Sequence, residues 1–238
     1  MKELSDIEVV HDRTGEMGPD EGFLRLKRFV VRNRYADGST SEDYSCDVVS
    51  RVRMDAVAVV IYEITDDRRV RVALRTGVRP PIWFRKDKDV THPLERDHLL
   101  LAEIVAGLLE PEDRGPGGIE RRAAAECFEE AGYVIEPERF VTLGGPLFAS
   151  PGITDETVHY RAVETDLDFR GEPVTDGSIM EEAGEVILLD LIEALRICRS
   201  GENPDAKTEI GLLRLCAHIG YLPQLECFAD ELERKSSS

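Results

Sequence analysis

The apolar positions along the chain follow two spacings, which predict strands in some segments and helices in others. Runs rich in β-branched and aromatic residues predict strands at residues 23–35, 42–53, 55–64, 70–79, 139–150, 156–165 and 185–189. Helical spacing predicts helices over 119–131, 191–199 and 205–222. The segment 98–110 fits both patterns, and its Gly107 favours a strand that ends there.

Turn and capping residues separate these elements. An Asp-Gly corner at 37–38 predicts that the first two strands form a hairpin. Asp190 is placed to cap the helix that follows it, and Gly201 to close that helix. Residues 80–97 hold three prolines and the only tryptophan, so we expect a long polar loop, a feature that is often functional.

Strands that pair locally, with few helices between them, favour an α+β domain with layers around a mixed sheet. Three regions are expected. Residues 1–54 form a polar, acidic arm and a small antiparallel β subdomain, residues 55–222 form the main domain, and residues 223–238 form a C-terminal tail.

Composition and charge exclude some classes of function. The 238 residues are 42% hydrophobic and carry a formal net charge of −18, which argues against a general nucleic-acid binder and against adsorption to an anionic membrane. The five cysteines form no C-x-x-C pair and no zinc pattern. No apolar run approaches the length of a membrane span. We therefore expect a cytoplasmic protein without nucleic-acid or membrane partners.

One short stretch, AAAECFEEAGY at residues 123–133, concentrates acidic side chains. It predicts the last turns of a helix, on which Glu126, Glu129 and Glu130 share one face. Two carboxylates about 5–6 Å apart repel by roughly 3 kcal/mol at an effective dielectric near 20. Either this face is solvated, or a hard divalent cation such as Mg²⁺ cancels the repulsion.

The flanking residues favour the cation. GLLEPEDRGPGGIERRAAAECFEEAGY (107–133) resembles the signature of the Nudix hydrolases, G-x5-E-x7-R-E-U-x-E-E-x-G-U, where U is apolar. The segments RTGVRPP (75–81), ASPGITDE (149–156) and GENPDAKTEIGLL (201–213) resemble the ADP-ribose pyrophosphatase branch of that family. The resemblance spans about residues 23 to 220 and implies an α/β/α sandwich, with an extra N-terminal sheet used for dimerisation and substrate binding.

The resemblance also implies an activity and a site. Nudix enzymes hydrolyse a nucleoside diphosphate linked to another group, so we expect Mg²⁺-dependent hydrolysis of ADP-ribose or a related nucleoside diphosphate sugar by a homodimer, with Mn²⁺ as a possible substitute. The implied metal ligands are Glu126, Glu129, Glu130, Glu182 and the carbonyl of Ala106. The implied catalytic residues are Glu130 and either Glu181 or Glu182, and the implied substrate-binding residues are Arg79, Glu156 and Arg53.

The chain departs from the Nudix pattern twice. First, Ala125 stands in place of the box arginine. Second, this position lies eighteen residues after Gly107, whereas the family pattern places its arginine fourteen residues after the glycine. The first box glutamate is therefore ambiguous between Glu112 and Asp113. Arg122, four residues before Glu126, is a hypothetical replacement for the lost arginine.

Three alternatives remain, of which the first two rest on these departures. A UDP-glucose-type pyrophosphatase is the nearest, because some members of the ADP-ribose branch also lack the arginine and carry extra residues before the helix. The second is a silent Nudix fold that binds nucleotide sugars without hydrolysing them, and the third is an ordinary acidic domain. A panel of nucleoside diphosphate sugars distinguishes them.

Overall fold

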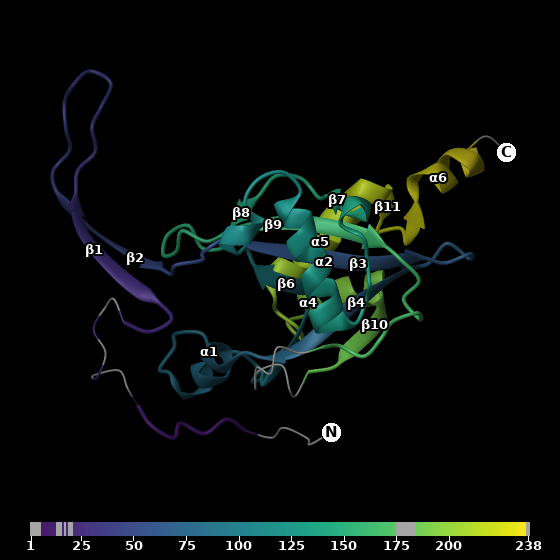
Figure 1. Ribbon diagram of the computed structural model, residues 1–238, viewed down its shortest axis with the longest axis horizontal. Coiled ribbons are helices and arrows are strands. Elements are labelled where there is room, and N and C mark those ends of the chain that lie inside the picture. Colours follow the sequence, from purple (N-terminus) through teal and green to yellow (C-terminus); the bar gives the residue numbers. More distant parts are fainter. Residues whose placement is uncertain (1–5, 13–15, 17, 19–20, 175–183, 237–238) are drawn as a thin grey trace.

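A mixed sheet lies at the centre of the molecule (Figure 1). The computed structural model describes residues 6–12, 16, 18, 21–174 and 184–236. Eight strands of this part of the chain form the sheet, along the order β10–β4–β3–β9–β7, with β5 on β4, β6 on β3 and β8 on β9. Their bounds are β3 (Ala56–Ile64), β4 (Val70–Val78), β5 (Leu100–Glu103), β6 (Val105–Leu108), β7 (Val141–Thr142), β8 (Leu147–Phe148), β9 (Thr157–Glu164) and β10 (Val186–Asp190). The pair β3–β9 is parallel and the others are antiparallel, as in a mixed sheet.

Helices cover both faces of this sheet. Helix α2 (Gly118–Ala131) packs on one face, and α4 (Leu191–Arg199) and α5 (Ala206–Ile219) pack on the other. Alternate residues of β3 enter the two cores: Val59 faces α2, whereas Val60 faces α4 and α5. Burial on both faces explains why β3 is a continuous apolar run, and it confirms the predicted α/β/α arrangement.

Helix α2 is set by its own sequence. Three alanines favour the helix, and Gly132 ends it in the left-handed conformation, with φ of 75°. At its other end Gly117 is also left-handed, with φ of 72°, so the helix begins at Gly118. The loop before it contains the 3-10 turn η2 (Pro111–Asp113).

Several predicted elements differ in detail. The segment 98–110 divides at Ile104 into two strands, because β5 pairs with β4 while β6 pairs with β3. The segment 139–150 keeps only the short β7 and β8, after the turn η3 (Pro137–Arg139). The loop 80–97 contains α1 (Pro80–Trp83) and the turn η1 (Phe84–Asp87).

The predicted cap at Asp190 is wrong. Asp190 does occupy the position before α4, but its side chain accepts no capping hydrogen bond. Its carboxylate lies 3.8 Å from Arg69 across the sheet edge instead. Asp205, at the start of α5, does cap: it accepts a hydrogen bond from the Thr208 backbone N–H.

The N-terminal hairpin projects away from the body (Figure 1). Strands β1 (Arg25–Val31) and β2 (Tyr44–Ser50) pair antiparallel, as predicted. Val49 donates a backbone hydrogen bond of 2.8 Å to Ile153, which joins the base of the hairpin to the loop before β9.

The last part of the chain forms further short elements. Strands β11 (Tyr221–Leu222) and β12 (Cys227–Phe228) pair with each other, and α6 (Ala229–Ser236) follows. The segment 223–238, expected to be a tail, is therefore folded over much of its length. In the ranges described, every helix is too short or too polar to cross a bilayer.

Candidate active site

Two carboxylates of α2 converge on the backbone of β6. Glu130 Oε2 accepts a hydrogen bond of 3.1 Å from the Ala106 N–H. The carboxylate of Glu126 lies against Gly107, where an added Cβ would come within 1.8 Å of Glu126 Oε1. A larger residue at position 107 of β6 would therefore force the Glu126 carboxylate to move. The structure thus brings Glu126 and Glu130, two of the expected metal ligands, to the backbone of Ala106 and Gly107.

The neighbours of these glutamates on α2 are a buried cysteine and a half-buried glutamate. Cys127, between these glutamates, points into the core and is fully buried. Burial, and then the negative charges of Glu130 and Glu126, raises the pKa of the Cys127 thiol well above its ordinary value. Glu129 is half-buried on the same helix. Cys127 is thus an inert core residue beside a negatively charged site.

The donor chemistry of this site fits a hard cation. Mg²⁺ takes oxygen ligands, and Glu126 and Glu130 bring carboxylate oxygens to the Ala106–Gly107 backbone. Within the described ranges, however, no three Asp, Glu, His or Cys side chains form a group that could hold a metal ion. The predicted further ligand Glu182 and its neighbour Glu181 lie in 175–183, outside the described residues.

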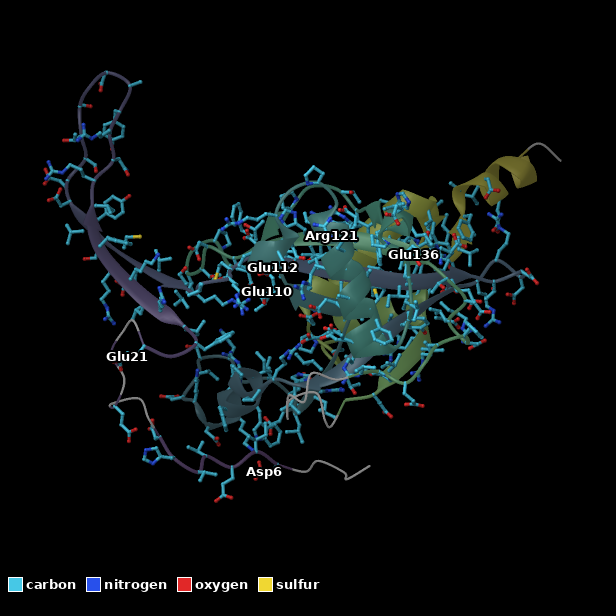
Figure 2. All side chains as sticks on the ribbon, in the orientation of Figure 1. Asp6, Glu21, Glu110, Glu112, Arg121 and Glu136 are labelled. Carbon is cyan, nitrogen blue, oxygen red and sulfur yellow. The ribbon has the colours of Figure 1, made fainter. Side chains whose placement is uncertain are left out.

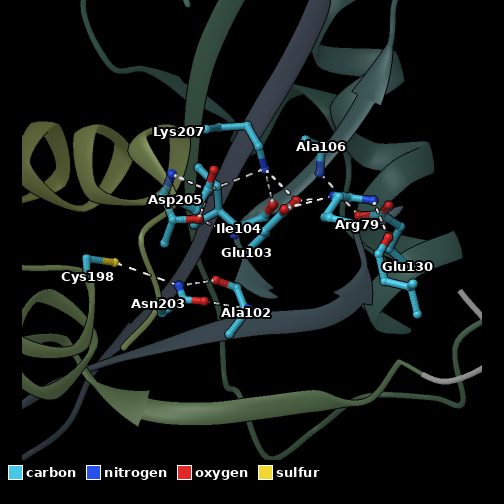
Figure 3. A network of polar contacts seen from close by, with 12 residues as sticks. Arg79, Ala102, Glu103, Ile104, Ala106, Glu130, Cys198, Asn203, Asp205 and Lys207 are labelled. Carbon is cyan, nitrogen blue, oxygen red and sulfur yellow. Dashed lines mark hydrogen bonds and ion pairs between the residues drawn. The ribbon is translucent and has the colours of Figure 1, made fainter. Parts of the chain in front are cut away.

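An ion network around the buried Glu103 lies beside the carboxylates (Figure 3). Arg79 donates to both oxygens of Glu103, at 2.9 Å from Nε and 2.6 Å from Nη2. Lys207 Nζ, on α5, lies 3.3 Å from Glu103 Oε2 and 3.2 Å from the Ile104 carbonyl. Burial would raise the pKa of Glu103, but Lys207 and Arg79 outweigh it and lower that pKa below 4.5. Glu103 is therefore a buried anion that fixes two cations.

Two arginines, Arg75 and Arg79, lie at the C-terminal end of α2 beside Glu130. Buried Arg75 donates a hydrogen bond of 2.7 Å to the Glu130 carbonyl, where it also complements the negative end of the helix dipole. The pKa of Arg79 is raised, first by its hydrogen bond to Glu103 and further by the charges of Glu103 and Glu130. Arg79, one of the expected substrate-binding residues, thus stands beside Glu130, as Figure 3 shows.

The other two predicted substrate residues lie where the hairpin joins the body. Glu156 accepts from Arg51 at 3.3 Å, and Arg53 donates to Glu110 at 2.6 Å. Glu110 directly precedes the loop that leads to α2, which Figure 2 shows with Glu112 labelled. Arg53 follows β2, Glu156 precedes β9, and Arg79 follows β4.

Sequence reasoning missed Glu103, Lys207 and Arg75. Lys207 lies in the segment 201–213, whose resemblance to known pyrophosphatases was the available signal. Lys207 and Glu103 are 104 positions apart in the sequence, so no local sequence pattern could predict their contact. Asn203 was missed for the same reason, although it exchanges hydrogen bonds of 2.7 and 2.6 Å with the backbone of Ala102.

The sandwich, with a carboxylate-bearing helix packed on its central sheet, is consistent with a Nudix hydrolase. No protein-family model matches the chain. The chain is 33% identical over 170 residues to the GDP-mannose pyrophosphatase of Salmonella arizonae, covering 71% of this chain and 76% of the relative. It is 28% identical over 156 residues to that of Salmonella typhimurium, covering 66% and 70%.

The chain therefore belongs to the family of these enzymes, the Nudix-type nucleoside diphosphate sugar pyrophosphatases. The relatives support this hydrolase family as a whole. They do not single out the ADP-ribose branch to which the sequence segments pointed.

Proposed function

We propose that this protein hydrolyses the diphosphate bond of a nucleoside diphosphate sugar in a Mg²⁺-dependent reaction. A water oxygen bonds to one phosphorus, the bond from that phosphorus to the bridging oxygen breaks, and a protein base accepts the proton of the water. The products are a nucleoside monophosphate and a sugar phosphate. The observation that carries the proposal is the convergence of Glu126 and Glu130 on the Ala106–Gly107 backbone.

Each residue has a proposed part. Glu126 and Glu130 would hold Mg²⁺, with Glu129, the Ala106 carbonyl and Glu182 as further ligands; Mn²⁺ could replace it. When bound, the ion neutralises charge on the diphosphate and lowers the pKa of a bound water. Either Glu181 or Glu182 acts as the base, with Glu130 as the further catalytic carboxylate.

Arg79 binds a phosphate of the substrate in this proposal. The Nε and Nη2 side of its guanidinium pairs with Glu103, and the remaining N–H groups of this planar cation would donate to phosphate oxygens. An anionic substrate is repelled by a chain of net charge −18, so local cations are required. Glu156 and Arg53, at the junction of the hairpin and the body, would contact the substrate from that side.

The substrate is the open choice. The relatives favour GDP-mannose, whereas the segments 75–81, 149–156 and 201–213 favour ADP-ribose. A panel of GDP-mannose, ADP-ribose and UDP-glucose with Mg²⁺, read by chromatography of the nucleoside monophosphate, ranks them. We expect one sugar nucleotide to give a nucleoside monophosphate and a sugar phosphate in equal amounts, and chelation of the metal to stop the reaction. Binding of all three without any monophosphate would instead identify a silent nucleotide-sugar binder.

We also propose that the enzyme is a cytoplasmic homodimer. The hairpin exposes Phe29, Val30 and Tyr44 at 49%, 73% and 48%, which supports an interface there. All five cysteines are free thiols, as suits a reducing compartment.

A further inference from the structure

The two departures from the Nudix pattern meet at one place in the structure. Ala125 carries no charge, and the extra residues lie in the loop between β6 and α2. Arg122 is on α2 one turn before Glu126, on the same face. This arginine, the loop and Glu126 are in contact.

Arg122 lies between two carboxylates. Its Nε donates a hydrogen bond of 2.9 Å to Asp113 Oδ2, and its Nη1 lies 3.7 Å from Glu126 Oε1. The side chains of Arg122, Asp113 and Glu126 are exposed by only 21%, 9% and 12%. Water and salt screen such a group less than they screen surface ion pairs.

The loop holds Asp113 in position for this contact. Asp113 Oδ2 also accepts a hydrogen bond of 2.8 Å from the Glu110 N–H, within a capping box around the turn η2. The Asp113 carbonyl packs on Gly118, where an added Cβ would come within 1.6 Å of it. Gly115 and Gly117 have φ of 87° and 72°, which lets the loop fold back onto the start of α2.

Of the two possible counterparts of the first box glutamate, Asp113 is the one that reaches the site. Glu112 is exposed, whereas the Asp113 carboxylate is enclosed by Arg122 and the Glu110 backbone. Burial lowers the pKa of Arg122, but the hydrogen bond and charge of Asp113, with Glu126 and Glu110, outweigh it and raise that pKa. The guanidinium is therefore a permanent charge at this point.

We propose that Arg122, anchored by Asp113 of the longer loop, replaces the missing box arginine and positions Glu126. The two departures are then coupled: the loop supplies the anchor for an arginine one turn earlier. Arg122 is a positioning residue, and its effect on hydrolysis rests on the function proposed above.

The first test removes the guanidinium. Arg122→Ala should lower kcat and the affinity for Mg²⁺ by about 10–100-fold, the usual cost of losing a group that orients a metal ligand. KM should change less, because Arg122 contacts a carboxylate ligand rather than substrate. The matched control is Arg121→Ala: the neighbouring arginine is exposed, donates to the Pro116 carbonyl, and should be replaceable without effect.

The second test restores the family arrangement. Ala125→Arg added to Arg122→Ala should recover at least tenfold in kcat and Mg²⁺ affinity. In a double-mutant cycle, Asp113→Asn should cost several-fold by itself but little once Arg122 is alanine, because the anchor then has nothing to hold. Additive losses would overturn the coupling.

Calorimetry with Mn²⁺ and metal-free thermal unfolding separate this inference from the proposed function. If the wild type hydrolyses no sugar nucleotide but Arg122→Ala still weakens Mn²⁺ binding, the function fails and the positioning role stands. If Arg122→Ala binds Mn²⁺ like the wild type, the positioning role is wrong, whatever the activity. Should Arg122→Ala not fold, Arg122→Lys, which keeps the charge but loses the fork, must lower Mn²⁺ affinity by several-fold for the proposal to survive.

Discussion

The central sheet and the N-terminal hairpin use the same kind of strand sequence with opposite results. Val57, Val59, Val60 and Ile61 of β3 are all 0% exposed, between helices on both faces. In the hairpin, Val30 is 73% exposed and Phe29 is 49% exposed. Residues that favour strands predict β structure in both regions, but only β3 buries its apolar side chains.

This difference indicates which region stabilises the fold and supports the candidate active site. The residues proposed for catalysis are attached to the buried region: α2 packs on the sheet through Ala123, Cys127 and Ala131, which leaves its carboxylates on the side facing β6. The hairpin meets the body through its base, where Val49 bonds Ile153 and Arg51 bonds Glu156. The body thus carries the residues proposed for catalysis, and the hairpin presents the apolar surface proposed to meet a second copy.

The largest expected effect lies in the body. Glu130→Gln keeps an oxygen that can accept the Ala106 N–H but removes the charge. We expect kcat to fall by about 100- to 10,000-fold, the range for removing a catalytic carboxylate, with almost no change in thermal midpoint. Exposed Glu136→Gln is the control. Near wild-type turnover of the Glu130 variant would remove the α2 carboxylates from the mechanism.

A matched pair of substitutions compares the regions directly. Val60→Ala in β3 should lower the free energy of unfolding by about 2–3 kcal/mol, since it removes two methyl groups from a core where Gly211 of α5 packs closely. Val30→Ala in β1 should change it by less than about 0.5 kcal/mol at concentrations where the protein is monomeric. Chemical denaturation measures both. Equal costs would mean that the hairpin is as buried as the sheet.

The ion network around Glu103 should make the free energy of unfolding depend on pH. The pKa of Glu103 is lowered in the folded state, so the unfolded chain takes up the proton first as pH falls. The stabilisation is complete above the ordinary value of 4.5 and is lost as pH falls through the folded pKa. Glu103→Gln should cost about 1–3 kcal/mol at pH 7 and progressively less below pH 4.5, by denaturant unfolding across pH. A cost that stays constant with pH contradicts this role.

The smallest expected effect is on assembly. Val30→Ser in the hairpin should weaken the proposed dimer about tenfold, equivalent to about 1.4 kcal/mol, and leave the unfolding of the body unchanged. Sedimentation at several concentrations measures the dissociation constant. A wild type that is monomeric throughout would show that the exposed hairpin serves another purpose.

Local patterns predicted the elements that depend on local chemistry. Strand β3 is apolar on both faces, and α2 is fixed by its alanines and Gly132, so both were expected at nearly the observed bounds. The break at Ile104 was not predicted, because it depends on which neighbour each half of the segment pairs with. Asp190 fits a capping position, yet its side chain lies near Arg69, directly before β4.

The site divides in the same way. Glu126 and Glu130 share a helical face by spacing alone, and the Nudix resemblance added Ala106, which the structure places against Glu130. Local sequence patterns could not predict the roles of Glu103 and Lys207. The two residues are far apart in the sequence and form an ion pair only in the folded chain. The anchor of Arg122 was likewise hidden until the loop placed Asp113 beside it.

Calorimetric titration of Mn²⁺ into the wild type and into a Glu126→Gln, Glu130→Gln double variant tests the α2 carboxylates most directly. The account predicts saturable binding by the wild type and the loss of that binding in the double variant, with both proteins folded. Equal binding by the two proteins, or none by the wild type even with GDP-mannose present, would contradict it.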